Sequence, residues 1–449
     1  MNTAAQRATR LWTAAGIVGA LVLTGCSAGT TPTATGPVSD ADIQKALETP
    51  TDLLFWSWLP DVEDEVALFE KKYPAINVTV ENVGQGPDHY AKVRAAIAAG
   101  AGAPDVIQLE YPYVSSFQLT DDLLDPSPYL PSDFSDGFVD WVWNQVSRGD
   151  QVLAIPQDSG PMGNLYRSDI YAQAGLTESP ATWAEYADAA AIVKEKTGSY
   201  ITDLPPNDAG AFIGLLWQAG IKPFAYEGGE KVGIAVDSPE AQEVAAYWQD
   251  LIDKDLVAVD PNFTDQWYQG LSSGKYAGWL TAAWGPVFLQ GTASDTAGLW
   301  TAARLPQWAE GEDVSGNVGG STSAVLSSSE NPIAAAELAK FINTDEESIT
   351  MLNQQQSLFP PQVSLLESQE FLAQKSEFFG GQEVNGLFAD ISTTVDSTFE
   401  WPPFMDYVYS SFEETIGAEI ASGGDLSAGL TAWQAALEEY ATGQGFTLE

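Results

Sequence analysis

The chain has 449 residues and a formal net charge of −44, because 62 Asp and Glu stand against only 18 Lys and Arg. This balance excludes the clustered basic surface that a nucleic-acid-binding protein needs. The hydrophobic share of 45% predicts a large buried core. A single cysteine, Cys26, and a single histidine, His89, exclude an intrachain disulfide and multi-cysteine or multi-histidine metal sites, so we expect neither a metal nor a cofactor.

Residues 1–25 have the pattern of a secretory signal peptide, in which two arginines precede an apolar run over 11–23. This run is too short to span a bilayer comfortably. The sequence Leu23-Thr24-Gly25-Cys26 follows and resembles the bacterial lipoprotein box, where the cysteine thiol receives a diacylglycerol. An ordinary secretory signal with a chance cysteine is the alternative. We therefore expect residues 26–50 to form a flexible tether that is lipidated at Cys26.

The body that follows alternates strand and helix patterns, which is typical of the α/β class. Strand patterns occur at 53–56, 76–80 and 105–109, and helix patterns lie between them at 61–73 and 87–99. This β-α-β-α-β order predicts the start of a doubly wound, mostly parallel sheet.

Four later helices are indicated by start signals or amphipathic stripes. Thr182 and Glu185 form a capping-box pattern, and prolines after Ser238 and Asn331 mark two further helix starts. The last stripe covers 426–440. We expect the aromatic side chains of these helices in the core, because amphipathic spacing alone explains them.

Ten short segments occur in a definite order along the chain. They are LLFWSW at 53–58, FEKKYP at 69–74, APDVI at 103–107, AIPQD at 154–158, LYRSD at 165–169, PATW at 180–183, GKYAG at 274–278, WGP at 284–286, VGGS at 318–321 and FPP at 359–361. In this order, and behind a lipoprotein box, they resemble the extracellular solute-binding lipoproteins of bacterial ABC importers. The resemblance is to the carbohydrate-binding family that includes maltose-binding protein.

The resemblance implies a two-lobed fold of the periplasmic-binding-protein type, with a ligand cleft between the lobes and a hinge of several segments. The expected crossings are near 155–157, 320–326 and 360–364, which gives lobe 1 as 51–156 and 327–362 and lobe 2 as 157–326 and 363–449. The implied function is capture of a sugar by cleft closure. The implied partners are an oligosaccharide and the ABC permease subunits, and the implied state is a lipid-anchored monomer on the outer face of the cell membrane.

A neutral-sugar site needs aromatic rings for the C–H faces of the sugar, beside carboxylates or backbone groups for its hydroxyls. Trp58 and Asp61 follow the first strand, although Asp61 could instead cap the next helix. Glu110 and Tyr111 follow the strand at 105–109, where no local feature demands a carboxylate. Asp158 matches an acidic ligand contact implied by the resemblance, and its alternative is a turn residue before Ser159-Gly160.

Further candidates lie later in the chain. Trp284 precedes Gly-Pro, which favours a loop over a core position. Gly320 and Ser321 could offer backbone N–H groups to a ligand or simply form a hinge turn. Trp401 and Phe404, in a Pro-Pro segment, are the third aromatic candidate at the cleft edge.

Basic residues are scattered among these segments, so we expect a neutral oligosaccharide whose identity the sequence does not specify. Two alternatives stay open. One is a secreted glycosidase that uses Glu110 and Asp158 as its carboxylate pair. The other is a surface sugar receptor or adhesin without transport. We expect no enzyme, because the segment order matches a binding protein and acidic residues are so common here that a carboxylate pair is expected by chance. Ser/His/Asp catalysis would have to use His89, which lies at the start of a helix, where capping or solvent exposure is the ordinary explanation.

Overall fold

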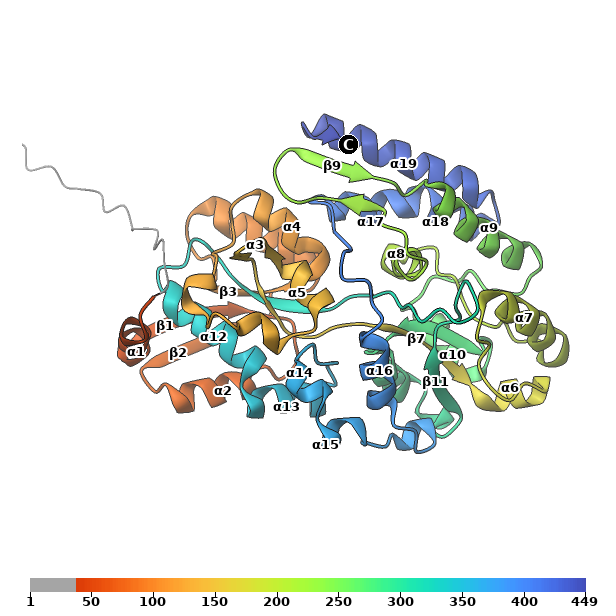
Figure 1. Ribbon diagram of the computed structural model, residues 1–449, viewed down its shortest axis with the longest axis horizontal. Helices are drawn as coiled ribbons and strands as arrows, with labels where there is room; N and C mark the ends of the chain where they lie inside the picture. Colours follow the sequence, from red (N-terminus) through yellow and green to blue (C-terminus); the bar gives the residue numbers. More distant parts are fainter. Residues whose placement is uncertain (1–37) are drawn as a thin grey trace, which may run out of the picture. The chain divides into compact units, whose positions relative to one another are not determined.

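The strands form four β-sheets in the computed structural model, which describes residues 38–449 (Figure 1). These described residues form one compact unit. The largest sheet has the order β2-β1-β3-β12-β6. Its strands are β1 (Thr51–Trp56), β2 (Ile76–Glu81), β3 (Val106–Glu110), β6 (Ile155–Pro156) and β12 (Ser321–Val325).

The first half of this sheet confirms the β-α-β-α-β prediction. β1 pairs in parallel with β2 and with β3. The connections are α2 (Glu63–Lys72) and α3 (Pro87–Ala99). Parallel strands require crossovers of this kind, because a tight turn cannot reverse the chain twice.

The strand β12 corrects one predicted boundary. It pairs antiparallel with both β3 and β6, so residues 321–325 lie inside the first sheet. The sequence-based boundary had placed this stretch in lobe 2. A short polar strand of Ser and Thr carries no sign of its sheet, since only the pairing partners decide that.

The second sheet is antiparallel, in contrast to the mostly parallel arrangement expected. Its order is β10-β7-β11, built from β7 (Met162–Arg167), β10 (Gly278–Ala282) and β11 (Trp300–Arg304). The two small sheets are β13-β9-β8, from Phe224–Ala225 (β8), Lys231–Ile234 (β9) and Thr447–Leu448 (β13), and the β4-β5 hairpin, from Ser147–Arg148 and Gln151–Val152. The two lobes implied by the resemblance correspond to the five-stranded sheet and to β10-β7-β11.

Helices surround these sheets (Figure 1). The remaining α-helices are α1 (Asp40–Glu48), α4 (Tyr111–Leu119), α5 (Asp140–Val146), α6 (Ser168–Ala174), α7 (Trp183–Thr197), α8 (Ala209–Gln218), α9 (Pro239–Asp253), α10 (Asp265–Ser273), α11 (Gly285–Thr292), α12 (Pro332–Thr344), α13 (Glu346–Gln354), α14 (Val363–Leu366), α15 (Gln369–Leu372), α16 (Val384–Ser392), α17 (Met405–Glu414), α18 (Ile416–Ser422) and α19 (Leu426–Gly443). Short 3₁₀ helices are η1 (Ser127–Tyr129), η2 (Phe134–Gly137), η3 (Ser294–Thr296) and η4 (Glu377–Phe379). Among the described residues, no helix has the length and apolar character needed to cross a membrane.

The predicted helix starts are confirmed. Thr182 and Glu185 form both hydrogen bonds of a capping box at the start of α7. Ser238 caps α9, whose first residue is proline, and Asn331 precedes Pro332 at the start of α12. α19 begins at Leu426 as its stripe predicts.

Helix α1 lies within the segment that was expected to be a flexible tether. Ser39 caps this helix, and Leu47 is buried in the same hydrophobic cluster as residues of α12. The tether prediction is therefore wrong for residues 40–48, because one buried leucine and a capped start attach this stretch to the folded body. The predicted signal peptide and Cys26 lie outside the described residues.

Candidate functional site

The carboxyl ends of β1 and β3 meet the beginning of β12. Trp58 comes shortly after β1, Glu110 ends β3, and Ser321 begins β12. Because β12 runs antiparallel to β3, Ser321 pairs directly with Glu110. Residues more than 200 positions apart in the sequence thus lie at one sheet edge, which is where ligands bind in open α/β sheets.

Asp158, which follows β6, forms hydrogen bonds with the first residue of β12 and with Tyr111 after β3. Its side-chain Oδ1 accepts a 2.7 Å hydrogen bond from the backbone N–H of Ser321. Its backbone carbonyl accepts a 2.8 Å bond from the hydroxyl of Tyr111. Burial raises the pKa of the Asp158 carboxyl to about 7, although the bond from Ser321 favours the ionised form.

The structure brings the predicted candidates Tyr111, Asp158, Gly320 and Ser321 together, and three of them, Tyr111, Asp158 and Ser321, are joined by hydrogen bonds. Tyr111 has no exposed surface, and its contact with a ligand stays a prediction. Gly320 has a φ of +98°, and a Cβ there would lie 2.6 Å from the ring of Tyr111. The positive φ and the close approach of Tyr111 leave no room for a Cβ, so this position requires glycine.

Glu110 faces a group of tyrosines. Its carboxylate accepts a 2.8 Å hydrogen bond from the hydroxyl of Tyr90, which in turn accepts the backbone N–H of Glu110 at 3.1 Å. The ring of Tyr113 lies 4.2 Å from that of Tyr90 and 6.3 Å from that of Tyr409 in α17. Burial raises the pKa of Glu110, so this carboxyl is costly to keep charged without a polar partner.

Tyr409 connects this group to the start of α8. Burial first, and then the nearby charges of Glu110 and Asp208, raise the pKa of Tyr409 well above its ordinary value. A Cβ at Gly210 would lie within 4 Å of the Asp208 carboxylate, the Tyr409 hydroxyl and Val318. Side chains from β3, from the residue that caps α8 and from α17 therefore converge on one region.

A cavity beside α8 adds aromatic rings to these carboxylates. Its lining includes Asp208, Asn262, Phe263, Trp279 and Trp284. Asn262 donates a 2.6 Å hydrogen bond to Asp208, whose other oxygen caps α8. Burial raises the pKa of Asp208. The cavity has a volume of about 20 Å³ in this structure, so it brings a carboxylate, an amide and indole rings together but does not enclose a space of sugar size.

Trp284 is half-buried at the wall of this cavity. Its indole N–H donates a 2.8 Å hydrogen bond to the carbonyl of Val318, which fixes the ring beside the chain crossing. The rings of Trp279, Phe288 and Phe263 lie 5.8, 5.5 and 6.3 Å away. Trp284 is also the residue before α11, in agreement with the predicted loop position.

Trp58 is half-buried against an unexpected neighbour. Its ring lies 4.9 Å from that of His89, edge to face. His89 is fully buried, so the predicted surface position is wrong. Burial lowers its pKa to about 4, and the imidazole is neutral at neutral pH. Asp61 is exposed with a φ of +59°, and the N-cap of α2 is Val62, so Asp61 does not cap that helix.

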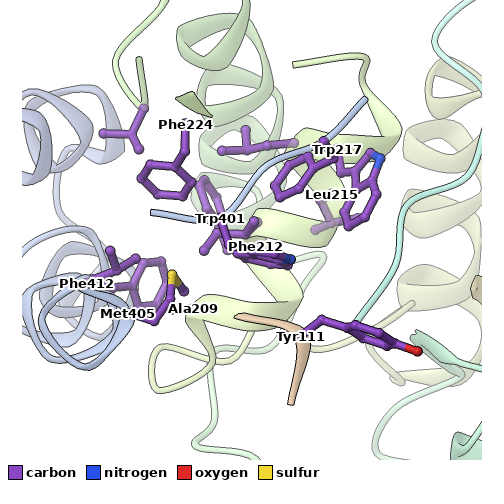
Figure 2. Packing of buried hydrophobic residues seen from close by; sticks show 14 of the residues in the cluster. Tyr111, Ala209, Phe212, Leu215, Trp217, Phe224, Trp401, Met405 and Phe412 are labelled. Carbon is purple, nitrogen blue, oxygen red and sulfur yellow. The ribbon is translucent and has the colours of Figure 1, made fainter. Parts of the chain in front are cut away.

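Trp401 and Phe404, which were predicted as ligand contacts, are buried in the hydrophobic core. Figure 2 shows Trp401 among buried rings that include Trp217. The indole N–H of Trp401 donates a 2.9 Å bond to Gln145. Phe404 packs on Tyr440. The prolines beside these residues mark an irregular segment, but irregular segments can be buried when their neighbours cover them.

Sequence reasoning missed several residues that the fold brings to this region. They are Tyr90, Tyr113, Asp208, Asn262, Phe263 and Tyr409. The one local signal was at Asp208, an N-cap residue before an apolar helix, which also explains a carboxylate without any ligand. The others lie on elements whose neighbours only the tertiary structure defines. Among residues 38–449, no group of three or more His, Cys, Asp or Glu could hold a metal ion.

Comparison with known proteins gives consistent matches. Residues 57–349 match the model of the bacterial extracellular solute-binding protein family. The chain is similar to an arabinooligosaccharide-binding protein of Halalkalibacterium halodurans, at 24% identity over 78% of this chain and 80% of that one. It is also similar to a lactose-binding protein of Rhizobium radiobacter, at 26% identity over 76% of this chain and 81% of that one.

Among solved structures, the chain is similar to an ABC-transporter-associated binding protein from B. animalis subsp. lactis Bl-04, which was solved in complex with β-1,6-galactobiose. The TM-score is 0.77 at 31% identity, and the match covers 89% of this chain and 99% of that one. The fold described above is thus found in a protein with a sugar bound to it.

Proposed function

The chain belongs to the family of bacterial extracellular solute-binding proteins, and we propose that it captures a short neutral oligosaccharide and delivers it to an ABC importer. Its relatives at this level of similarity bind sugars. We propose binding and not catalysis as the role of this site. Glu110 and Asp158 are the carboxylate pair that a glycosidase would use, and the environment of Asp158 does not favour catalysis. Asp158 is buried and already accepts a hydrogen bond from Ser321.

The observation that supports the proposal best is the meeting of Glu110, Asp208 and Trp284 through intermediate contacts. Glu110 accepts a hydrogen bond from Tyr90, whose ring packs on Tyr113, and the ring of Tyr113 packs on that of Tyr409. Asp208 and Trp284 line one cavity. Carboxylates accept hydrogen bonds from sugar hydroxyls, and the indole ring stacks on the C–H face of a pyranose. We propose Trp58 as a second ring of this site, supported from behind by His89.

A neutral ligand follows from the charges at the site. The lining of the cavity holds Asp203 and Asp208 and includes neither Lys nor Arg. Arg94, near Tyr113, forms an ion pair with Asp406 at 3.4 Å. An anionic sugar would meet carboxylates without a compensating guanidinium, and desolvation would make this contact costly. Because similar proteins bind β-1,6-galactobiose and lactose, galactose-containing oligosaccharides are the first candidates.

The location of the protein is a second part of the proposal. Family membership implies a place outside the cytoplasm. We propose that residues 1–25 are removed and that Cys26 bears a lipid that anchors a monomer to the outer face of the membrane. A labelled fatty acid should enter the wild-type protein in cells. The Cys26→Ser variant should not be labelled, and persistent labelling would contradict the anchor.

The binding proposal is tested by calorimetry on purified residues 36–449. The panel is β-1,6-galactobiose, lactose, arabinobiose and maltose, with a diuronate and a dipeptide as controls. We expect a neutral saccharide to bind and to raise the melting temperature, without release of reducing sugar. Glu110→Gln should weaken that binding, whereas Glu195→Gln, on an exposed part of α7, should not. Binding of none of the neutral sugars, or turnover of one, would contradict the proposal.

A further inference from the structure

Phe263 has a backbone conformation that its residue type disfavours. Its φ is +58°, a region that bulky residues rarely occupy. Both of its neighbours are held in place by hydrogen bonds. The backbone N–H of Asn262 donates to Asn207 at 3.0 Å, and the hydroxyl of Thr264 caps α10 by accepting the N–H of Trp267 at 3.2 Å. A strained residue held between two fixed ones suggests that the direction of its side chain has a function.

Burial of the ring does not explain this backbone conformation of Phe263. Its side chain is 44% exposed, and Phe288 on α11 is 39% exposed. Their ring centroids lie 6.1 Å apart. The other large exposed hydrophobic residues of the described chain, Leu119 and Ile192, belong to α4 and α7. Two exposed phenylalanines side by side therefore form a distinct apolar patch.

The apolar patch of Phe263 and Phe288 adjoins the ring of Trp284. The ring of Phe263 is tilted by 38° relative to the indole at 6.3 Å, and the ring of Phe288 stands at 75° to it at 5.5 Å. Phe263 and Trp284 also line the same cavity, together with Asp208. The face of Phe263 thus extends the aromatic surface of the candidate site outward, and Phe288 stands at its side.

We propose that Phe263 and Phe288 form an additional stacking subsite that accepts a third sugar ring beyond the one on Trp284. The inference rests on the proposed function and concerns the length of the ligand. A phenyl ring stacks on the C–H face of a sugar but offers no hydrogen bond, so this subsite selects for length with little selection for linkage. The carboxylates beside Trp284 remain the polar part of the site.

The test compares disaccharides with the trisaccharides of the same series by calorimetry. The probes are β-1,6-galactobiose and galactotriose, α-1,5-arabinobiose and arabinotriose, and maltose and maltotriose. In the wild type, we expect the trisaccharide of the bound series to bind about tenfold more tightly than the disaccharide. Phe263→Asn removes the ring but tolerates the left-handed backbone, and Phe288→Ala removes the second ring.

Each variant should reduce the preference for the trisaccharide to about twofold or less. Phe288→Ala, which lies outside the lining of the cavity, should also leave the disaccharide affinity and the melting temperature unchanged. Ile192→Ala is the matched control for loss of exposed apolar surface and should change neither affinity. Equal binding of di- and trisaccharide by the wild type would overturn the subsite and leave the proposed function intact. Unchanged trisaccharide affinity in both variants would also overturn the subsite. If sugar uptake by cells fell in these same variants, the patch of Phe263 and Phe288 would be a contact surface for the permease. Binding of no saccharide would overturn the proposed function and the subsite with it.

Discussion

The carboxylate of Asp158 accepts the backbone N–H of Ser321 at 2.7 Å, although the two residues are 163 positions apart in the sequence. The bond joins the segment after β6 to the first residue of β12. Both residues are buried, and Asp158 also holds the hydroxyl of Tyr111 through its carbonyl. This contact fixes the edge of the five-stranded sheet from which Glu110 faces the candidate site.

Removal of that carboxylate should destabilise the fold. Asp158→Ala leaves a buried N–H donor without its partner, which should lower the free energy of unfolding by about 1–3 kcal/mol. Asp158→Asn should cost less, because its amide oxygen can accept the same bond. Urea unfolding measures both variants, with the exposed Asp133→Ala as the control. An Asp158→Ala variant as stable as the wild type would show that the bond contributes nothing.

The same residue should give stability a pH dependence of known sign. Burial raises the pKa of Asp158 from 3.8 to about 7 in the folded state, so the folded protein binds this proton more tightly than the unfolded chain. The contribution is fully present below pH 3.8 and is lost as pH rises through about 7. Wild type should therefore gain stability relative to Asp158→Asn between pH 8 and pH 5. A difference that is constant over this range would contradict the raised pKa.

His89 should act in the opposite direction. Its pKa falls from 6.5 to about 4 on folding, because burial disfavours the imidazolium. Its contribution is present above pH 6.5 and is lost as pH falls towards 4. In denaturant unfolding at pH 7.5, 5.5 and 4.5, the advantage of wild type over His89→Gln should shrink only at the two lower values. A parallel pH response of the two proteins would mean that the imidazole is accessible to protons in the folded state.

Two tryptophans should separate binding from stability. Trp401→Ala removes a fully packed core ring and should lower the free energy of unfolding by about 3–5 kcal/mol, with sugar affinity retained in the fraction that folds. Trp284→Ala should reduce sugar affinity about tenfold or more with a smaller loss of stability. Trp284→Phe is the matched control, since it keeps a stacking ring but loses the bond to Val318. Equal stability losses for the two alanine variants, with unchanged affinity, would place Trp284 in the core.

The local patterns of the sequence predicted several elements correctly. The capping box at Thr182 and the proline starts of α9 and α12 depend on residues within one turn of each other, and such signals are complete in the sequence. The alternation of strands and helices between residues 51 and 110 has the same local character. Membership of the family was also predicted from short segments in order, and the family match confirms it.

The burial of single residues could not be predicted in the same way. Trp401 directly precedes a proline and Trp284 lies two residues before one. Trp401 is nevertheless 4% exposed and packs on Trp217, whereas Trp284 is half-buried at a cavity. His89 lies in the first turn of a helix that the sequence predicts to be exposed there, but its ring is buried and packs edge to face on Trp58. Each of these differences depends on which distant element covers the residue.

The sequence by itself thus determined the family, the order of the first strands and helices, and the residue types available for a sugar. These properties follow from short-range spacing and composition. Only the tertiary structure decided that Glu110, Asp208, Trp284 and Tyr409 share one region and that Trp401 does not. Strand pairing and helix packing bring together residues that are up to about 300 positions apart, and no local pattern records which of them will meet.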